Sequence, residues 1–261
     1  MDLSLLMEVS IVSAVTRETK FCNRVCHNPA MGTLYLVRHG QASFGAADYD
    51  NLSELGQRQS QRLGQYLAAK NLQFGTVVVG TLKRHAQTLA GIQDGPQGGL
   101  QAGGVALAAS PVLWPGLNEY DSAAVIKAVH PAPLPKADSP ELYRHHFRIL
   151  RHGLTEWMHG KTQPVGMPAY PDFVKGVTSA LDHVRQHCTG NVLLVSSGGP
   201  ISTAVGHLLG IAPEMTIELN LRIRNTSVTE FEFNAKRHTL ITYNTLPHLD
   251  GEDFSKWITF S

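Results

Sequence analysis

Three short stretches of the sequence combine side chains that can handle an anion, and each follows an apolar run. They are Arg38-His39-Gly40 after residues 33–37, Leu82-Lys83-Arg84 after 76–79, and Ser197-Gly198-Gly199 after 191–195. A neutral imidazole is a nucleophile near pH 7, and guanidinium groups hold oxyanions in a fixed fork geometry. Any one of these stretches alone is typical of surface polarity or of a turn. Their joint occurrence favours a single anion-handling site.

The apolar runs before these stretches have the length and composition of buried strands. Nearly every residue in each run is apolar, which is typical of a strand covered on both faces of a parallel sheet. In an open α/β sheet, ligands collect at the carboxyl ends of such strands. We therefore expect the three stretches to meet at one edge of the sheet.

Helical patterns alternate with these strands. Ser53 can cap a helix that reaches about Lys70, and further helices are predicted over about 82–92, 171–188 and 198–209. Residues 227–233 and 239–243 alternate like an antiparallel pair that turns near residue 234. The predicted fold is α/β: a three-layer sandwich with a mostly parallel central sheet and helices on both faces.

Several regions interrupt this alternation. Residues 1–30 are irregular, and we expect an N-terminal extension, disordered or loosely docked, before a domain over 31–261. Residues 121–170 are rich in proline and are predicted to be an insertion that contains a helix from a Ser139 cap to about His159. The glycine-rich residues 95–104 predict a loop, and residues 105–109 predict a further strand.

The chemistry-bearing stretches also resemble a known family. Val-Arg-His-Gly at 37–40, followed by Leu-Ser-Glu-Leu-Gly-Gln-Arg-Gln at 52–59, resembles the histidine phosphatase superfamily, which has the phosphoglycerate-mutase-like fold. Leu-Lys-Arg-His-Ala-Gln-Thr at 82–88 resembles its second arginine motif, and Leu-Asn-Glu at 117–119 resembles its acid motif. The resemblance extends from Gly32 to about Tyr243.

This resemblance implies a role for each residue. His39 would be the nucleophile that becomes phosphohistidine, Arg38 and Arg84 would hold the phosphoryl oxygens, and Glu119 would protonate the leaving oxygen and then deprotonate water. The rest of the implied substrate-binding set is Gln41, Ser43, Ser197 and Gly198. Such phosphoryl transfer depends on positioning and charge neutralisation, so the resemblance implies no cofactor and no metal.

The sequence departs from the family pattern at two positions. Val-Ser-Ser-Gly-Gly at 195–199 stands where the family has Val-Ser-His-Gly-Gly, so Ser197 replaces a second histidine. In other enzymes, removing one hydrogen-bond donor to a developing oxyanion lowers the rate by about 10²–10³. His85 could compensate, although neighbouring residues on a helix point about 100° apart. Gly45 stands where the mutase branch usually has Asn, which weighs against a glycolytic mutase.

A second Arg-His-Gly tripeptide occurs at 151–153. It lies inside the helical pattern that begins at Ser139, and it lacks the Leu-Ser-x-x-Gly-x-x-Gln element that follows the first copy. We therefore interpret it as an exposed helix segment rather than as the nucleophile. His145 and His146 are likewise interpreted as facing solvent, because adjacent helical residues point in different directions.

Composition narrows the class of protein. The chain has 261 residues, of which 43% are hydrophobic and 16% charged, as expected for one or two globular domains. A net charge of +1 without charge blocks gives no support to a nucleic-acid or membrane partner. Three cysteines argue against a disulfide framework and favour the cytoplasm as location.

The expected function is therefore hydrolysis of a small phosphomonoester through phosphorylated His39. Two alternatives stay open: a phosphoglycerate-mutase-like phosphate transferase, and a weakly active pseudophosphatase that binds phosphorylated ligands. Ser197 keeps the last alternative open. We expect Ser197→His to raise turnover modestly, because the backbone amides of the 198–199 turn should hold the phosphate in either variant. If the pocket has instead adapted to serine, the larger ring should clash and turnover should fall.

Overall fold

The computed structural model describes residues 31–43, 50–94, 110–136 and 138–260. Its centre is a six-stranded mixed sheet with the order β3-β2-β4-β1-β5-β6. The four strands β3, β2, β4 and β1 run parallel to one another, whereas β5 pairs antiparallel with β1 and β6 antiparallel with β5. The strands are β1 (Gly32–Arg38), β2 (Thr76–Val79), β3 (Val112–Leu113), β4 (Gly190–Ser196), β5 (Val228–Phe233) and β6 (His238–Thr245).

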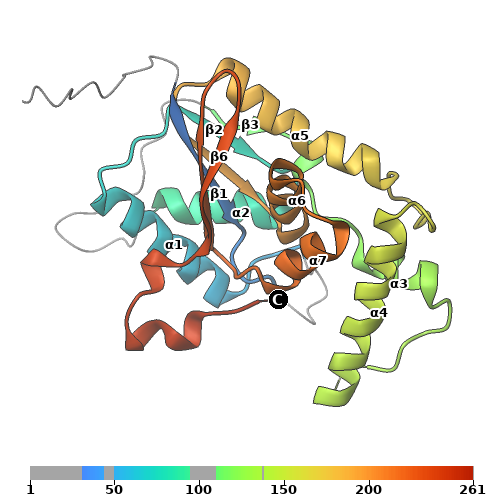
Figure 1. Ribbon diagram of the computed structural model, residues 1–261. Coiled ribbons are helices and arrows are strands. Elements are labelled where there is room, and N and C mark those ends of the chain that lie inside the picture. Colours follow the sequence, from blue (N-terminus) through green and yellow to red (C-terminus); the bar gives the residue numbers. More distant parts are fainter. Residues whose placement is uncertain (1–30, 44–49, 95–109, 137, 261) are drawn as a thin grey trace, which may run out of the picture.

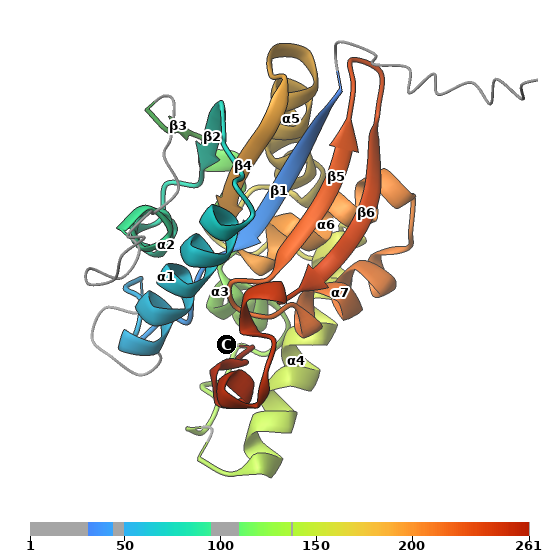
Figure 2. The same ribbon diagram turned by 90° about the vertical axis from the view of Figure 1, so that its left-hand side faces the viewer.

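Helices cover both faces of this sheet (Figures 1 and 2). On one face, α1 (Glu54–Ala69) and α2 (Lys83–Asp94) pack on the side chains of Val37, Leu193 and Val195. On the other face, α5 (Tyr170–His187) and α6 (Gly198–Leu209) pack on the alternate residues, among them Leu34 and Leu194. The central strands β1, β2 and β4 are mostly apolar because successive side chains point to opposite faces and both faces are buried. The predicted three-layer α/β fold is confirmed.

Local sequence signals explain where the helices begin and end. The Ser53 hydroxyl caps α1 by accepting from the amide of Gly56 at 3.0 Å, as the sequence predicts. Ser139 caps α4 (Pro140–Met158), which ends next to His159, again as predicted. Gly210 ends α6 in the left-handed conformation at φ 63°, which glycine adopts without steric cost.

Two helices and several short elements have no counterpart among the sequence predictions. The helices are α3 (Ser122–Val129) and α7 (Pro213–Arg222), each only two to three turns long. The 3₁₀ turns are Pro115–Leu117, Pro247–Leu249 and Glu252–Trp257. The sequence expectations for residues 1–30, the loop at 95–104 and the strand at 105–109 fall outside the described residues.

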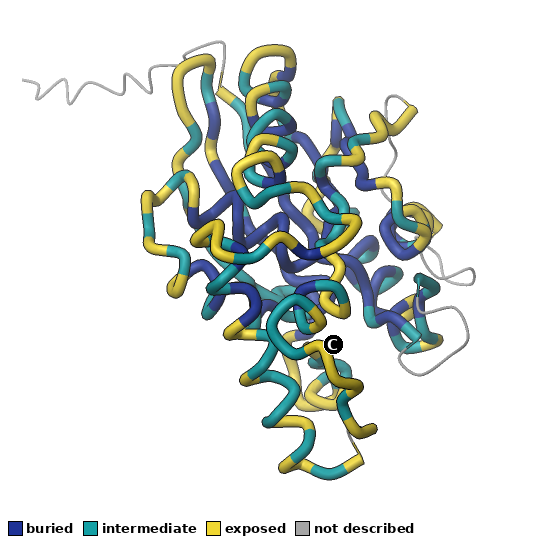
Figure 3. The backbone as a smooth tube through the Cα atoms, turned by 90° about the vertical axis from the view of Figure 1, so that its right-hand side faces the viewer, coloured by how far each residue is buried: buried dark blue, intermediate teal, exposed yellow. Residues whose placement is uncertain are grey.

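Helices α3 and α4 pack against each other and extend away from the sheet (Figure 1). Gly153 of α4 permits this approach, since a Cβ there would lie 2.8 Å from the carbonyl oxygen of Val125 in α3. Buried residues concentrate in the body of the molecule, whereas this projecting part is mostly intermediate or exposed (Figure 3). The region 121–170, predicted to be an insertion, therefore contains a helical pair with its own surface.

We predict that a protein beginning at Met31 keeps the melting temperature and the activity of the full chain. Residues 1–30 show no sustained hydrophobic periodicity, and β1 begins at Gly32, where its pairing with Gly190 and Phe233 is already in place. Differential scanning calorimetry of the two proteins measures the effect. A truncated protein that aggregates, or that melts several degrees lower, would contradict this expectation.

Candidate active site

The Arg38-His39-Gly40 stretch leaves the carboxyl end of β1 beside the end of β4. The His39 amide donates to the carbonyl of Ser196 at 2.9 Å, and the His39 carbonyl accepts from Asn225 Nδ2 at 3.2 Å. Gly40 then lets the chain pass close to α1, because a Cβ would lie 2.4 Å from the carbonyl oxygen of Gly56. The main chain around His39 is therefore held from three sides.

The hydrogen bonds of His39 define which ring nitrogen is available. Nδ1 lies 2.6 Å from the carbonyl oxygen of Gly40, so this nitrogen must carry the proton. Nε2 lies 3.2 Å from Nε of Arg84, which is always a donor, so Nε2 must present its lone pair. Burial, with the charges of Arg38 and Arg84 next in importance, lowers the pKa of His39 well below 6.5. The result is a neutral imidazole whose unprotonated Nε2 can act as a nucleophile once Arg84 releases it.

The two arginines approach His39 from different elements. Arg84, in the first turn of α2, is buried and forms an ion pair with Asp50, with 2.7 Å between Nη1 and Oδ1. The same Asp50 accepts from the amide of Lys83 through its other oxygen at 2.9 Å. Arg38, at the end of β1, donates through Nη1 to the carbonyl of Ile223 at 2.7 Å. Both guanidinium groups are thus oriented before any ligand binds.

Glu119 is held by the N-terminus of α6. The amide of Gly199 donates to both carboxylate oxygens at 3.1 Å, and the amide of Tyr120 donates to one of them at 3.2 Å. Gly199 is required here, since a Cβ would lie 2.1 Å from Oε1 of Glu119. Burial raises the pKa of Glu119, and the Gly199 amide and the nearby arginines only partly oppose this effect.

Ser197 occupies the N-cap position of α6, but its hydroxyl does not cap that helix. Instead Ser197 Oγ lies 2.7 Å from Nε2 of His85, and both residues are fully buried. The His85 ring also lies beside that of His39, with 5.8 Å between ring centroids. Gly80, at the end of β2, makes room for it, because a Cβ there would lie 2.2 Å from Nδ1 of His85.

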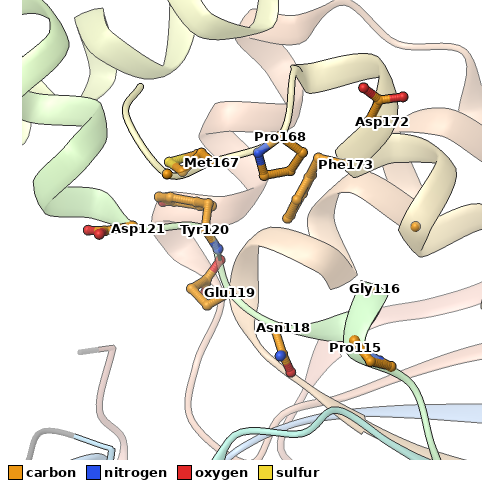
Figure 4. A pocket seen from close by; sticks show the side chains of 12 residues that line it. Pro115, Gly116, Asn118, Glu119, Tyr120, Asp121, Met167, Pro168, Asp172 and Phe173 are labelled. Atoms are coloured by element: carbon orange, nitrogen blue, oxygen red, sulfur yellow. Dashed lines mark hydrogen bonds between the residues drawn. The ribbon is translucent and has the colours of Figure 1, made fainter. Parts of the chain in front are cut away.

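A cavity of about 410 Å³ opens at this edge of the sheet and has Arg38, Gln41 and Glu119 in its wall. A second cavity of about 250 Å³ shares Glu119 and Tyr120 but lies between the 115–121 segment and the start of α5. Figure 4 shows Tyr120, Met167, Pro168 and Phe173 around this second hollow. Its charged lining among the described residues is acidic, whereas the larger cavity contains a guanidinium, so the larger one suits an anion.

Comparisons with known proteins identify the family of the chain. A family model described as the histidine phosphatase superfamily (branch 1) matches residues 34–123 and 156–246. The chain belongs to the histidine phosphatase superfamily. The two matched ranges leave out residues 124–155, which include most of the helical pair α3 and α4.

Solved structures of this superfamily share the fold at low sequence identity. A phosphoserine phosphatase of Entamoeba histolytica in complex with 3-phosphoglyceric acid has 19% identity and a TM-score of 0.56, over 84% of this chain and 99% of that one. A phosphoglycerate mutase of Bacillus anthracis has 17% identity and a TM-score of 0.55, over 84% and 95%. The protein histidine phosphatase SixA with tungstate has 16% identity and a TM-score of 0.51, over 84% and 99%. No curated protein matches the sequence.

The structure also explains the superfamily element at 52–59. Gln59 accepts from the amide of Gln41 at 2.9 Å and donates to the carbonyl of Trp257 at 2.6 Å. The Gln41 side chain in turn accepts from the Ser53 hydroxyl at 2.8 Å. These residues therefore tie α1 to the His39 turn and to the C-terminal segment.

The predicted substrate-binding residues are not all brought together. Gln41 lines the larger cavity, and Gly198 is the buried first residue of α6, beside Ser197. Ser43 lies further along the chain, where its amide pairs with the carbonyl of Asn51 at 2.8 Å. Within the described residues, its side chain makes no hydrogen bond to the rest of the predicted site.

The second Arg-His-Gly copy behaves as the sequence predicts. It lies in α4, His152 is exposed, and Arg151 forms an ion pair with Glu218 of α7. The interpretation of His146 as facing solvent is wrong, because α4 presents this residue to the wall of the larger cavity. Sequence reasoning also missed Asp50, whose position in a loop gives no periodic signal.

Neither a membrane span nor a metal cluster is found in the part of the chain that the structure describes. None of its helices combines the length and the hydropathy that crossing a bilayer requires. None of its side chains form a group of three or more His, Cys, Asp or Glu arranged for a metal ion.

We predict that the protein loses stability as the pH falls from about 6.5 towards 3. Burial, and secondarily Arg84, lowers the pKa of His85 from 6.5 to about 3; burial and Arg62 do the same for His248. Between these two pH values the unfolded chain takes up protons that the folded protein does not. The free energy of unfolding should therefore drop by up to about 1.4 kcal/mol per pH unit for each histidine.

Urea unfolding at pH 7, 6 and 5 measures this slope. His248→Gln should reduce the slope by about the contribution of one histidine, because glutamine stays neutral and can still reach Thr226 Oγ1, now 2.9 Å from Nε2 of His248. His152→Gln, on the exposed side of α4, is the matched control and should leave the slope unchanged. Equal slopes in wild type and His248→Gln would contradict the assignment.

Proposed function

We propose that this protein hydrolyses small phosphomonoesters in two steps through a phosphohistidine at His39. The observation that carries the proposal is the state of the His39 ring: Nδ1 donates to Gly40, and Nε2 presents a lone pair beside the Arg84 guanidinium. An imidazole fixed in this tautomer is ready to attack phosphorus without first losing a proton. The superfamily membership of the chain supports the same chemistry.

In the first step, the His39 Nε2 lone pair forms a bond to phosphorus while the bond from phosphorus to the leaving oxygen breaks. Arg84 and Arg38 neutralise the charge on the phosphoryl oxygens, and binding of the phosphoryl group displaces the 3.2 Å contact of Arg84 with His39. Glu119 gives its proton to the leaving oxygen. The raised pKa of Glu119, which results from burial, increases the fraction that carries this proton at neutral pH.

In the second step, water attacks phosphorus and the bond between phosphorus and Nε2 breaks. Glu119, now a carboxylate, takes a proton from the attacking water and returns to its starting state. His39 leaves as the same neutral tautomer, because Nδ1 keeps its proton through the hydrogen bond to Gly40. Inorganic phosphate and the alcohol or phenol are the two products.

The proposal is tested by turnover of p-nitrophenyl phosphate together with intact-mass detection of the phosphoenzyme in acid-quenched samples. Turnover with a covalent phosphoryl adduct is expected. Binding of phosphorylated ligands without either signal would favour the pseudophosphatase instead, for which the observation is Ser197 in the place of a second histidine.

The lining of the larger cavity weighs against the mutase alternative. A mutase must hold a second anionic group of its substrate while the phosphoryl group is on the enzyme. Of the described residues that line this cavity, Arg38 is the sole lysine or arginine. With that guanidinium assigned to the phosphoryl group, the described lining offers no second lysine or arginine for another anionic group.

A further inference from the structure

The wall of the larger cavity combines polar and apolar side chains. Its polar residues are Arg38, Gln41, Glu119, Ser122, His146 and Asn220. The remainder is mostly apolar and comes from α3, α4, α7 and the C-terminal segment: Ile126, Tyr143, Phe147, Leu150, Leu221 and Phe260. A volume of about 410 Å³ is within the range of pockets that hold small molecules. The part of the substrate beyond the ester oxygen would therefore meet hydrocarbon.

We infer that the substrates are monoesters of phosphate with an apolar alkyl or aryl group, which binds between α4 and α7. This inference rests on the proposed function for its orientation, because it places the phosphoryl group at Arg38. Two aromatic side chains of α4 support it: Tyr143 and Phe147 lie against each other with 4.8 Å between ring centroids, and both line the cavity. A second anionic group on the substrate would lose its hydration there and would meet no lysine or arginine of the described lining other than Arg38.

The test uses n-alkylphosphonates from methyl to hexyl, which the enzyme cannot hydrolyse, and measures Kd by calorimetry. Burial of apolar surface predicts that Kd falls about fourfold for each added methylene until the cavity is filled. Phe147→Ala should weaken the dependence on chain length, whereas His152→Ala on the exposed side of the same helix should not. Kd values that do not change with chain length would overturn the inference.

This measurement separates the inference from the proposed function. If Kd depends on chain length but no phosphomonoester is turned over, the apolar pocket is supported and the proposed hydrolysis is contradicted. If p-nitrophenyl phosphate is turned over but Kd does not change with alkyl chain length, the proposed hydrolysis is supported and the apolar pocket is contradicted. Carboxylated ligands such as phosphoserine and 3-phosphoglycerate should bind more weakly than butylphosphonate, and tighter binding of either would also overturn the inference.

A separate observation concerns the contact between His85 and Ser197. The family pattern has histidine at 197, and this chain has an imidazole at 85 whose Nε2 reaches Ser197 Oγ at 2.7 Å. The two side chains come from α2 and from the N-cap of α6, and both are fully buried. Together with the nearby His39 ring, they place a hydroxyl and an imidazole at the end of β4 where the family pattern would place an imidazole alone.

We propose that His85 and Ser197 act as one unit in place of the second histidine, with the serine hydroxyl donating to a phosphoryl oxygen and His85 holding that hydroxyl in position. His85 is a positioning residue, because it acts through Ser197. A neutral His85 can donate from Nε2 to Ser197 Oγ, which leaves the hydroxyl proton free for the phosphoryl oxygen. Like the first inference, this proposal rests on the proposed function, because it places the phosphoryl group at His39.

Four variants test this unit: His85→Leu, Ser197→Ala, their combination, and the exchange His85→Ala with Ser197→His. Each single loss should lower kcat with p-nitrophenyl phosphate by about 10²–10³, and the combination should lower it no further. The exchange should recover most of the loss, because it returns an imidazole to the family position and removes the ring that blocks it. A purely structural role for His85 would not be repaired in this way.

Ser197→His without the change at 85 should lower kcat. In the wild type, Oγ of Ser197 already lies 2.7 Å from Nε2 of His85, so a larger side chain at 197 would clash with the His85 ring. Should the exchange variant fail to fold, His85→Gln provides the second test, because its amide can donate to the same hydroxyl; it should keep more activity than His85→Leu. Orthovanadate affinity gives the same comparison without turnover. Wild-type kcat and vanadate affinity in folded His85→Leu would overturn the proposal.

Discussion

His39→Ala is expected to lower turnover of p-nitrophenyl phosphate by about 10⁴–10⁶ and to remove the phosphoenzyme altogether. The reason is that the substitution deletes the atom to which the phosphoryl group would be bonded. The two arginines proposed to bind the phosphate should remain oriented, since Arg84 keeps its ion pair with Asp50 and Arg38 its hydrogen bond to the carbonyl of Ile223. The variant should therefore still bind orthovanadate or phosphate.

The second Arg-His-Gly tripeptide supplies the matched control. His152→Ala removes an exposed imidazole from the same sequence context, and it should leave both turnover and phosphoenzyme unchanged. Acid-quenched intact-mass spectrometry and steady-state rates measure both effects. A phosphoenzyme that persists in His39→Ala would exclude His39 as the nucleophile.

Glu119→Gln is expected to lower kcat by about 10²–10⁴, by an amount that depends on the leaving group. An alkyl leaving oxygen needs the proton of Glu119 in the first step, so an alkyl phosphate should give no phosphoenzyme in this variant. p-Nitrophenolate leaves without a proton, so the phosphoenzyme should still form from p-nitrophenyl phosphate. It should then accumulate, because the second step needs the Glu119 carboxylate to activate water.

Rapid-quench measurements with the two substrates separate these outcomes. Glutamine keeps an acceptor for the Gly199 amide, which now donates to both oxygens of Glu119 at 3.1 Å, so local structure should be preserved. Glu141→Gln on the exposed start of α4 controls for the loss of one carboxylate. Equal rate losses for both substrates, without accumulation, would show that Glu119 does not transfer protons.

The sequence predicts the sheet and its main helices well because their signals are local. Runs such as 191–195 are apolar at every position, and the caps at Ser53 and Ser139 form as their residue types indicate. Helices α3 and α7 escape prediction because each has only two or three turns, which is too short for a clear helical periodicity. The third strand is two residues long and is defined by its pairing with β2.

From the sequence, a site residue could be predicted only where it directly follows the end of a predicted strand. His39, Arg38, Arg84 and Ser197 fall at such ends, and the structure brings them to one edge. The ion pair of Asp50 with Arg84 depends on a loop, and the contact of His85 with Ser197 depends on how α2 leaves β2. Helical geometry suggests that His85 points away from Arg84. It reaches the same site because Gly80 leaves space for the ring.

That space at Gly80 links position 85 to position 197, which is far away in the sequence. The His85 ring lies beside Gly80 and contacts Ser197 Oγ at 2.7 Å, so a histidine at 197 would compete with it for the same space. During evolution, histidine at 85 should therefore have been gained together with the loss of histidine at 197, and only where position 80 is glycine. Among related sequences, positions 80, 85 and 197 should vary together. Sequences that have neither histidine at 197 nor the pair of histidine at 85 with serine at 197 should show reduced selection on this pocket.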